Sequence, residues 1–252
     1  MATIKVDHVG LNFTVLDVAR ASIKHQFRRV LGGEVETSRG HTVVHALKDI
    51  NFSARAGDRI ALLGQNGSGK SSLLRVLGGI YAPTLGKVST TGRVSCLFDM
   101  WFGMDLDATG RENVTLRGMC LGLTKRAAEA MLPDVLELTE LGPYIDLPVR
   151  TYSLGMQTRL AFAVTTAVRG DILLLDEVIG SADWNFVGAA RGRLEQMIGD
   201  AGIAVITSHD MSLVRRLCNR GLLLANGHLA MDGAVADVVA AYESGSGYTS
   251  AG

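Results

Sequence analysis

Short apolar runs alternate with amphipathic segments along most of this chain. The runs 59–63, 172–175 and 203–206 consist mainly of aliphatic residues, a pattern typical of strands that are covered on both faces of a parallel sheet. The segment 71–80 instead repeats its apolar residues at the spacing of a helix. This alternation predicts an α/β fold in which strands and helices follow one another along the chain.

Between about residues 92 and 170 the pattern changes to one of helices. We predict three helices in this stretch, at about 111–122, 124–141 and 155–169. Pro133 is expected to kink or restart the second of them. We interpret the stretch as a helical subdomain inserted in the α/β core, which resumes at Asp171.

The two ends of the chain lie outside this pattern. Residues 1–43 are expected to form a strand and an amphipathic segment, in which Ile23 and Phe27 belong to an apolar stripe. Near the other end, Asn226-Gly227 separates two predicted strands, and residues 244–252 are expected to be a disordered tail. We therefore predict a single domain over residues 1–252.

Composition narrows the possible partners and sites. Lys and Arg together number 25 and so do Asp and Glu, so no overall field attracts nucleic acid. The three cysteines lie far apart in the sequence, in no metal-binding spacing, and are expected to be free thiols. No apolar run approaches the ~18 residues of a membrane span, and no signal-peptide pattern opens the chain.

Residues 64–71 match the phosphate-binding pattern G-x-x-x-x-G-K-[ST] at every fixed position. The pattern lies between a predicted strand and a predicted helix, where backbone N–H groups and the helix N-terminus favour a nucleotide phosphate. Lys70 would reach the β- and γ-phosphates, and the Ser71 hydroxyl would ligate Mg²⁺. The candidate nucleotide-binding residues are Gly64, Gln65, Asn66, Gly67, Ser68, Gly69, Lys70, Ser71 and Ser72.

Two carboxylates, Asp176 and Glu177, follow the apolar run 172–175 directly. Carboxylates at the carboxyl end of a central strand emerge where α/β sheets bind ligands. Asp176 is predicted to support the Mg²⁺ ion, and Glu177 to polarise the attacking water.

A third motif lies between the first two. Ser153, Gly155 and Gln157 stand directly before an apolar helix, in a turn that resembles the Leu-Ser-Gly-Gly-Gln signature of ABC-transporter ATP-binding subunits. Tyr152 and Leu154 depart from that signature. In this family the turn closes over the γ-phosphate bound by the other subunit of a dimer. The resemblance implies an α/β P-loop NTPase core of ABC type with an inserted helical subdomain.

Other positions agree with the family or depart from it. Asp183 resembles the aspartate that communicates across the dimer, and His209 resembles the histidine that contacts the γ-phosphate. The glutamine expected before the helical subdomain is absent, and Asp99 is the polar candidate in its place, at the metal. The position expected for the aromatic residue that stacks on adenine falls near His41, which is the candidate for this stacking role and would stack less strongly than a tyrosine.

These departures resemble the ATPase subunits of O-antigen, capsular polysaccharide and teichoic acid exporters. That resemblance implies an enzyme that binds ATP and Mg²⁺ and forms an ATP-sandwich homodimer. It also implies a membrane-spanning permease as partner, at the cytoplasmic face of the inner membrane. In similar exporters the amphipathic segment lies near the membrane, while a surface helix packed on the core is the alternative. We expect no C-terminal carbohydrate-binding domain of the kind that some relatives carry.

Other functions stay open from the sequence. The chain could serve an ABC transporter of a different substrate, or a soluble ABC ATPase, although the latter usually carries two cassettes or coiled-coil arms. A P-loop kinase is disfavoured by the signature turn and by His209. A module that binds ATP without hydrolysis is disfavoured by Glu177 and His209.

Overall fold

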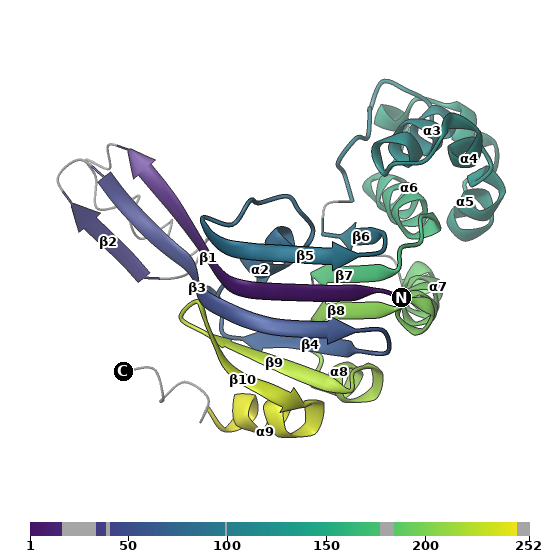
Figure 1. The fold of residues 1–252 in the computed structure, drawn as a ribbon. Coiled ribbons are helices and arrows are strands. Elements are labelled where there is room, and N and C mark those ends of the chain that lie inside the picture. Colours follow the sequence, from purple (N-terminus) through teal and green to yellow (C-terminus); the bar gives the residue numbers. More distant parts are fainter. Residues whose placement is uncertain (17–33, 39–40, 99, 177–183, 246–252) are drawn as a thin grey trace. The chain divides into compact units, whose positions relative to one another are not determined.

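The computed structural model describes residues 1–16, 34–38, 41–98, 100–176 and 184–245, with side chains except at 15–16, 34–38, 41, 184–185 and 187. The described residues divide into two compact units (Figure 1). The first takes its residues from 1–94, 171–177 and 202–252, and the second from 95–170 and 178–201. The sequence places the inserted subdomain at about 92–170, whereas the second unit also takes in residues 178–201.

A mainly parallel sheet forms the centre of the first unit, with strand order β10-β9-β4-β8-β7. β4 pairs in parallel with β8 and β9, and β7 pairs in parallel with β8. β8 is buried at every residue and β4 at every residue after Arg59, which confirms the interpretation of the aliphatic runs. The strands are β4 (Arg59–Gly64), β7 (Ile172–Asp176), β8 (Ile203–Thr207), β9 (Arg220–Ala225) and β10 (His228–Ala234).

The predicted hairpin near the end of the chain is confirmed by β9 and β10, which pair in antiparallel fashion. Asn226 and Gly227 connect them with positive φ angles of 51° and 83°. Two consecutive positive φ angles are the signature of a tight hairpin turn, which Asn-Gly adopts at little cost. This turn also contacts a distant part of the chain: the Lys48 N–H donates to the Gly227 carbonyl oxygen at 2.8 Å.

A second, antiparallel sheet of the first unit has the order β2-β3-β1-β5. Ile4, Val6 and Val9 of β1 are buried while their neighbours Lys5 and Asp7 are exposed, so one face of the sheet is covered. The sequence predicts only one N-terminal strand here. The strands are β1 (Thr3–Leu16), β2 (Glu34–Ser38), β3 (His41–Arg55) and β5 (Leu85–Thr91).

The helices described in the first unit are α2 (Lys70–Leu77), α8 (Met211–Leu217) and α9 (Val235–Ser244). α2 confirms the predicted helix after the glycine-rich loop. Ser244 is the last residue of α9, with Gly245 as its C-cap at a φ of 71°, so the predicted disordered tail does not begin at Ser244. Residues 246–252 and the amphipathic segment around Ile23 and Phe27 lie outside the described residues.

The chain passes through β6 (Val94–Leu97) into the helical unit. Thr109 and Glu112 form a capping box at the first helix, and Thr124 and Ser153 cap two others. Pro133 stands in the first turn of its helix, so the predicted segment 124–141 restarts there as a new helix. The elements are α3 (Gly110–Cys120), α4 (Lys125–Glu129), α5 (Leu132–Thr139), η1 (Gly142–Asp146), η2 (Val149–Thr151) and α6 (Leu154–Ala167).

A further helix, α7 (Trp184–Asp200), belongs to the helical unit. Phe186 of α7 packs edge-on against Phe162 of α6, with ring centroids 5.4 Å apart. Arg193 of α7 forms an ion pair with Asp134 of α5, in which one guanidinium nitrogen lies 2.8 Å from the carboxylate. These contacts span 24 residues for the phenylalanine pair and 59 for the ion pair, which explains why this unit is not one continuous stretch.

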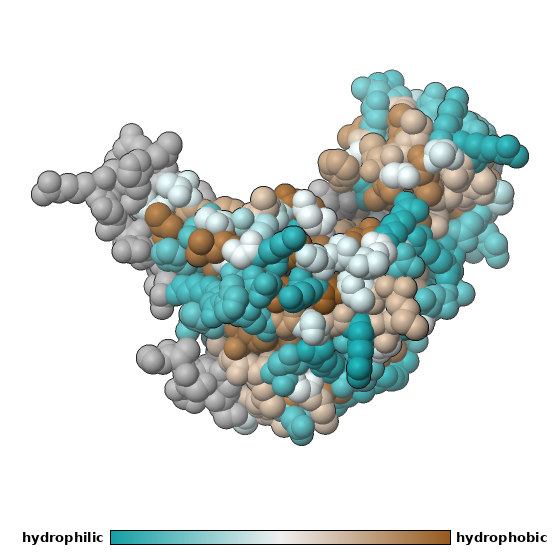
Figure 2. Space-filling view, viewed as in Figure 1, coloured by the Kyte–Doolittle hydropathy of each residue, from teal (hydrophilic) through white to brown (hydrophobic). Residues whose placement is uncertain are grey.

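The distribution of polar and apolar residues over the surface agrees with the absence of net charge in the composition. On the face shown in Figure 2, hydrophilic residues are interspersed among apolar ones over both units. Among the described residues, no helix is both long enough and apolar enough to span a bilayer.

The three cysteines are free and differ in exposure, which predicts different thiol reactivity. Burial raises the pKa of Cys96 to about 11 and that of Cys218 to about 12, whereas Cys120 is exposed. Only the thiolate attacks a disulfide reagent. At pH 8 the partly buried Cys96 and the buried Cys218 would hold thiolate fractions of roughly 10⁻³ and 10⁻⁴.

We therefore expect one fast equivalent of thiol per native chain when an aromatic disulfide reagent is added at pH 8. The Cys120→Ser variant should lose this fast phase, and unfolding in guanidinium should expose the other two thiols. A fast phase that persists in Cys120→Ser would contradict the burial of Cys96 and Cys218.

Candidate functional site

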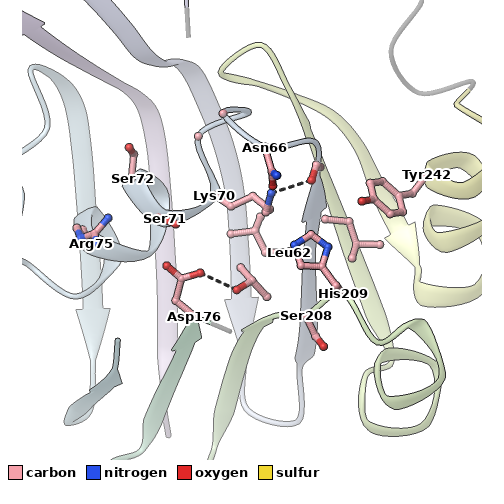
Figure 3. Close-up of a pocket in the computed structure, with 15 residues that line it drawn as sticks. Leu62, Asn66, Lys70, Ser71, Ser72, Arg75, Asp176, Ser208, His209 and Tyr242 are labelled. Atoms are coloured by element: carbon pink, nitrogen blue, oxygen red, sulfur yellow. Dashed lines mark hydrogen bonds between the residues drawn. The ribbon is translucent and has the colours of Figure 1, made fainter. Parts of the chain in front are cut away.

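The glycine-rich loop connects the end of β4 to the start of α2 (Figure 3). At Gly64 (φ 149°) an added Cβ would lie 2.5 Å from the Leu224 carbonyl oxygen, and at Gly69 (φ 105°) 2.7 Å from that of Ala46. Neither contact can relax easily, because both oxygens belong to neighbouring backbone. The two glycines therefore allow the loop to lie close against β9 and β3 while it turns into the helix.

Lys70, the first residue of α2, reaches back over the loop. Its Nζ donates to the carbonyl oxygens of Gly64 at 2.7 Å and of Gln65 at 3.0 Å. The ammonium group is thus held within the loop at a helix N-terminus, where backbone N–H groups and the helix dipole already favour an anion. Positive charge and N–H donors therefore converge on one point.

Asp176 approaches the loop from the carboxyl end of β7. In the parallel register it lies opposite Thr207 of β8, and the Thr207 hydroxyl donates to its Oδ1 at 2.7 Å. This bond fixes the orientation of the carboxylate. The Asp176 carboxylate is thus held by the buried strand and by the hydroxyl donor, and it lies near Ser71 of α2 at the same cavity.

His209 lies just beyond the end of β8, on the segment that leads to α8. Asp210 caps α8 by accepting from the N–H groups of Ser212 at 3.0 Å and Leu213 at 3.1 Å. The helix therefore begins two residues after His209, at Met211, and the cap at Asp210 fixes the backbone next to His209.

These groups line one cavity of about 220 Å³. Most of the predicted loop residues line it, and Lys70, Ser71, Ser72, Asp176 and His209 lie around it in Figure 3. Pockets that enclose a whole small ligand usually have roughly 300–1,000 Å³, so this cavity is small for a complete nucleotide. The lining residues are Leu62, Leu63, Gly64, Asn66, Gly67, Gly69, Lys70, Ser71, Ser72, Arg75, Asp176, Thr207, Ser208, His209 and Tyr242.

Six of the lining residues were not predicted as site residues: Leu62, Leu63, Arg75, Thr207, Ser208 and Tyr242. Arg75 stands one helical turn after Ser71, so the helical period of α2 offered a signal for it. Arg75 also lies over the ring of Tyr81 at 6.0 Å, and Tyr81 packs edge-on against Phe13 at 5.5 Å. The aromatic pair is therefore next to a residue that lines the cavity, because Arg75 contacts both the cavity and the Tyr81 ring.

Several predicted site residues cannot be placed at this cavity. Glu177, Asp183 and Asp99 lie outside the described residues. His41 begins β3, but its side chain also lies outside them. Their predicted roles stay predictions.

The turn formed by Ser153, Gly155 and Gln157 belongs to the helical unit. The Ser153 hydroxyl accepts from the Met156 N–H at 3.2 Å, and the Gln157 amide donates to the Val149 carbonyl at 3.1 Å. Ser153 thus acts as the N-cap of α6, while Leu154 beside it is 74% exposed. Hydrogen bonds within the helical unit therefore hold the turn, and the Leu154 side chain, the first of α6, faces outward.

Tyr152 explains one departure from the familiar signature. It is buried, and its hydroxyl donates to the Tyr144 carbonyl at 2.5 Å; burial raises its pKa. A Cβ added to Gly110 would lie 2.5 Å from this hydroxyl. The tyrosine therefore fastens the turn to η1, and Gly110 leaves room for it.

Comparisons with known proteins cover most of the chain. It is 39% identical over 229 residues to the O-antigen export system ATP-binding protein RfbE of Yersinia enterocolitica, covering 90% of this chain and 96% of that protein. It is 31% identical over 240 residues to the teichoic acids export ATP-binding protein TagH of Lactococcus lactis, covering 95% of this chain but only 50% of that protein.

A solved structure supports the same fold. The dimeric ATP-binding cassette MJ0796, in a post-hydrolysis state bound to ADP and Pi, aligns with a TM-score of 0.66 at 20% identity, over 92% of this chain and 98% of that one. The model of the ABC transporter family matches residues 47–180, which include the glycine-rich loop, the Ser153 turn and Asp176. With its loop, carboxylate and signature turn in the family's order, the chain belongs to the ABC transporter family.

Proposed function

We propose that this chain is the ATP-hydrolysing subunit that powers export of a polysaccharide or lipid-linked glycan through a separate membrane-spanning partner. The observation that supports ATP hydrolysis is that one cavity is lined by Lys70, Ser71, Asp176 and His209. The identity to O-antigen and teichoic acid export proteins supports the class of transported substrate.

Lys70 would bind the β- and γ-phosphates of ATP, with the loop N–H groups around them. Ser71 and Asp176 would hold Mg²⁺, because their oxygens line the same cavity. Within the described part of the chain, no three His, Cys, Asp or Glu side chains form a metal cluster, and Mg²⁺ typically needs only one or two carboxylates beside phosphates and waters. When bound there, the ion would neutralise charge that develops on the phosphate oxygens.

Glu177 would position the attacking water and accept its proton, and His209 would contact the γ-phosphate. The adenine end would lie toward Ser72 and Arg75, near the aromatic pair Phe13 and Tyr81. An aromatic face there suits stacking on a planar base, and we propose this pair in place of His41.

A second copy of the chain would complete each site. The cavity of about 220 Å³ leaves room for another surface, and the Ser153 turn presents an exposed side chain beside an N-terminal helix cap. We propose that the turn of one subunit closes on the phosphates bound by the other, and that Asp183 communicates across the interface. The dimer would dock on the permease at the cytoplasmic face of the inner membrane.

The test is made in the source organism. Deletion of the coding sequence is expected to remove the surface glycan, detected by immunoblot of whole cells, and to leave lipid-linked glycan inside. The wild-type chain and a Lys87→Ala variant, which changes an exposed lysine of β5, should restore the glycan, whereas Lys70→Ala should not. A normal surface glycan in the deletion strain would contradict the proposed substrate.

A further inference from the structure

Tyr242, near the end of α9, lines the same cavity as Lys70 and His209. It stands 172 residues after the glycine-rich loop's lysine in the sequence. In Figure 3 its ring points from α9 toward the cavity, on the same side of Lys70 as His209. We propose that Tyr242 binds the terminal phosphate of the nucleotide, so that it distinguishes ATP from ADP. This inference rests on the proposed function.

The packing of α9 directs Tyr242 toward the cavity. Val238 and Val239 are fully buried, and a Cβ added at Gly221 of β9 would lie 2.6 Å from the Val238 side chain. The absence of a side chain at Gly221 thus lets α9 lie closely on the sheet. Tyr242 follows these valines by four and three residues, which places it on the same face of the helix, one turn further on.

The helix that follows His209, α8, and the helix that contains Tyr242, α9, are linked to each other. Arg215 of α8 forms an ion pair with Glu243 of α9 at 2.8 Å, and Glu243 is the next residue after Tyr242. Because α8 begins two residues after His209, at Met211, this contact connects the two cavity-lining side chains through two short helices. Both groups are therefore held at the same side of the cavity.

The position of Tyr242 indicates which phosphate it would meet. Figure 3 shows Ser72 and Arg75 on one side of Lys70 and shows His209 and Tyr242 on the other. Lys70 is expected at the β- and γ-phosphates, and α2 leads away from them toward Arg75. The triphosphate would then end on the side of His209 and Tyr242, where a phenolic hydroxyl can donate to a phosphate oxygen.

A hydrogen bond from a neutral hydroxyl to a charged phosphate oxygen contributes more binding free energy than a hydrogen bond between two neutral groups. Tyr242→Phe removes this donor without changing the packing volume of the ring. We expect the affinity for a non-hydrolysable ATP analogue with Mg²⁺, measured by isothermal titration calorimetry, to fall on the order of 10-fold. The affinity for ADP should change less than about 2-fold, because ADP lacks the terminal phosphate.

Tyr144→Phe is the matched control, because Tyr144 is exposed in the helical unit and its side chain has no role in the proposal. It should bind both nucleotides as the parent does, and melting temperatures of all three proteins should agree within about 2 °C. An unchanged affinity of Tyr242→Phe for the ATP analogue would overturn the assignment. An equal loss for both nucleotides, or a lowered melting temperature, would show a packing role and overturn it too.

The parent protein separates this inference from the proposed function. If the parent binds ATP and ADP and hydrolyses ATP while Tyr242→Phe equals it throughout, only the role of Tyr242 is contradicted. If the parent binds neither nucleotide, the nucleotide site itself is contradicted, and the role of Tyr242 with it.

Discussion

Lys70→Ala is expected to abolish productive ATP binding and to lower ATP turnover by roughly 100-fold or more. The change removes the ammonium group that lies 2.7 Å from the Gly64 carbonyl and 3.0 Å from that of Gln65. Loss of one preorganised charge contact in a partly dry site costs on the order of 3 kcal/mol. Phosphate release by the purified protein and calorimetric ATP titration would measure both effects.

The matched control for this experiment is Lys87→Ala, an exposed lysine on β5 of the same unit. It should keep parental turnover, which shows that loss of one positive charge is not the cause. Circular dichroism should report the same secondary structure for both variants. Near-normal turnover by a folded Lys70→Ala protein would refute the assignment of the phosphate site.

Glu177→Gln is expected to bind Mg-ATP but to hydrolyse it about 10²–10⁴-fold more slowly, the range that general-base catalysis supplies. Glu177 directly follows Asp176, whose carboxylate is held by the Thr207 hydroxyl at 2.7 Å. The metal ligand would therefore be preserved while the base is lost. Because ATP then persists, the variant should accumulate as an ATP-dependent dimer, visible by size-exclusion chromatography with light scattering.

Glu137→Gln, an exposed position on α5, makes the same chemical change away from the site and should hydrolyse ATP normally. Normal hydrolysis by Glu177→Gln would rule out the proposed base. A Glu177→Gln protein that binds ATP and stays monomeric at high concentration would instead count against a site shared between two copies.

The local parts of the site were predictable because each is a short continuous pattern. The loop from Gly64 to Ser71 needs no distant partner to be recognised, since its glycines, lysine and hydroxyl are fixed by spacing alone. The same holds for Asp176 at the end of an aliphatic run. The capped helix after Ser153 likewise follows from nearby residues.

Contacts between distant segments were harder to predict. The antiparallel sheet pairs β1 with β5 across about 80 residues, and the sequence shows no periodic signal for such pairing beyond alternation within each strand. α7 joins the helical unit through Arg193 and Asp134, 59 residues apart. No sequence pattern near either residue indicates the other as its partner. The extent of the helical unit could therefore not be predicted from the sequence.

The sequence by itself determined the α/β fold, the phosphate loop with Lys70 and Ser71, the carboxylate of Asp176 and the family to which the chain is similar, because these depend on local spacing and hydrophobic period. Only the tertiary structure decided that Thr207 orients Asp176, that Arg75 connects the cavity to Phe13 and Tyr81, and that Tyr242 lines the cavity. The reason is physical: parallel strands bring their carboxyl ends to one edge, and the packing of α9 on β9 brings a residue from the far end of the chain to the same place.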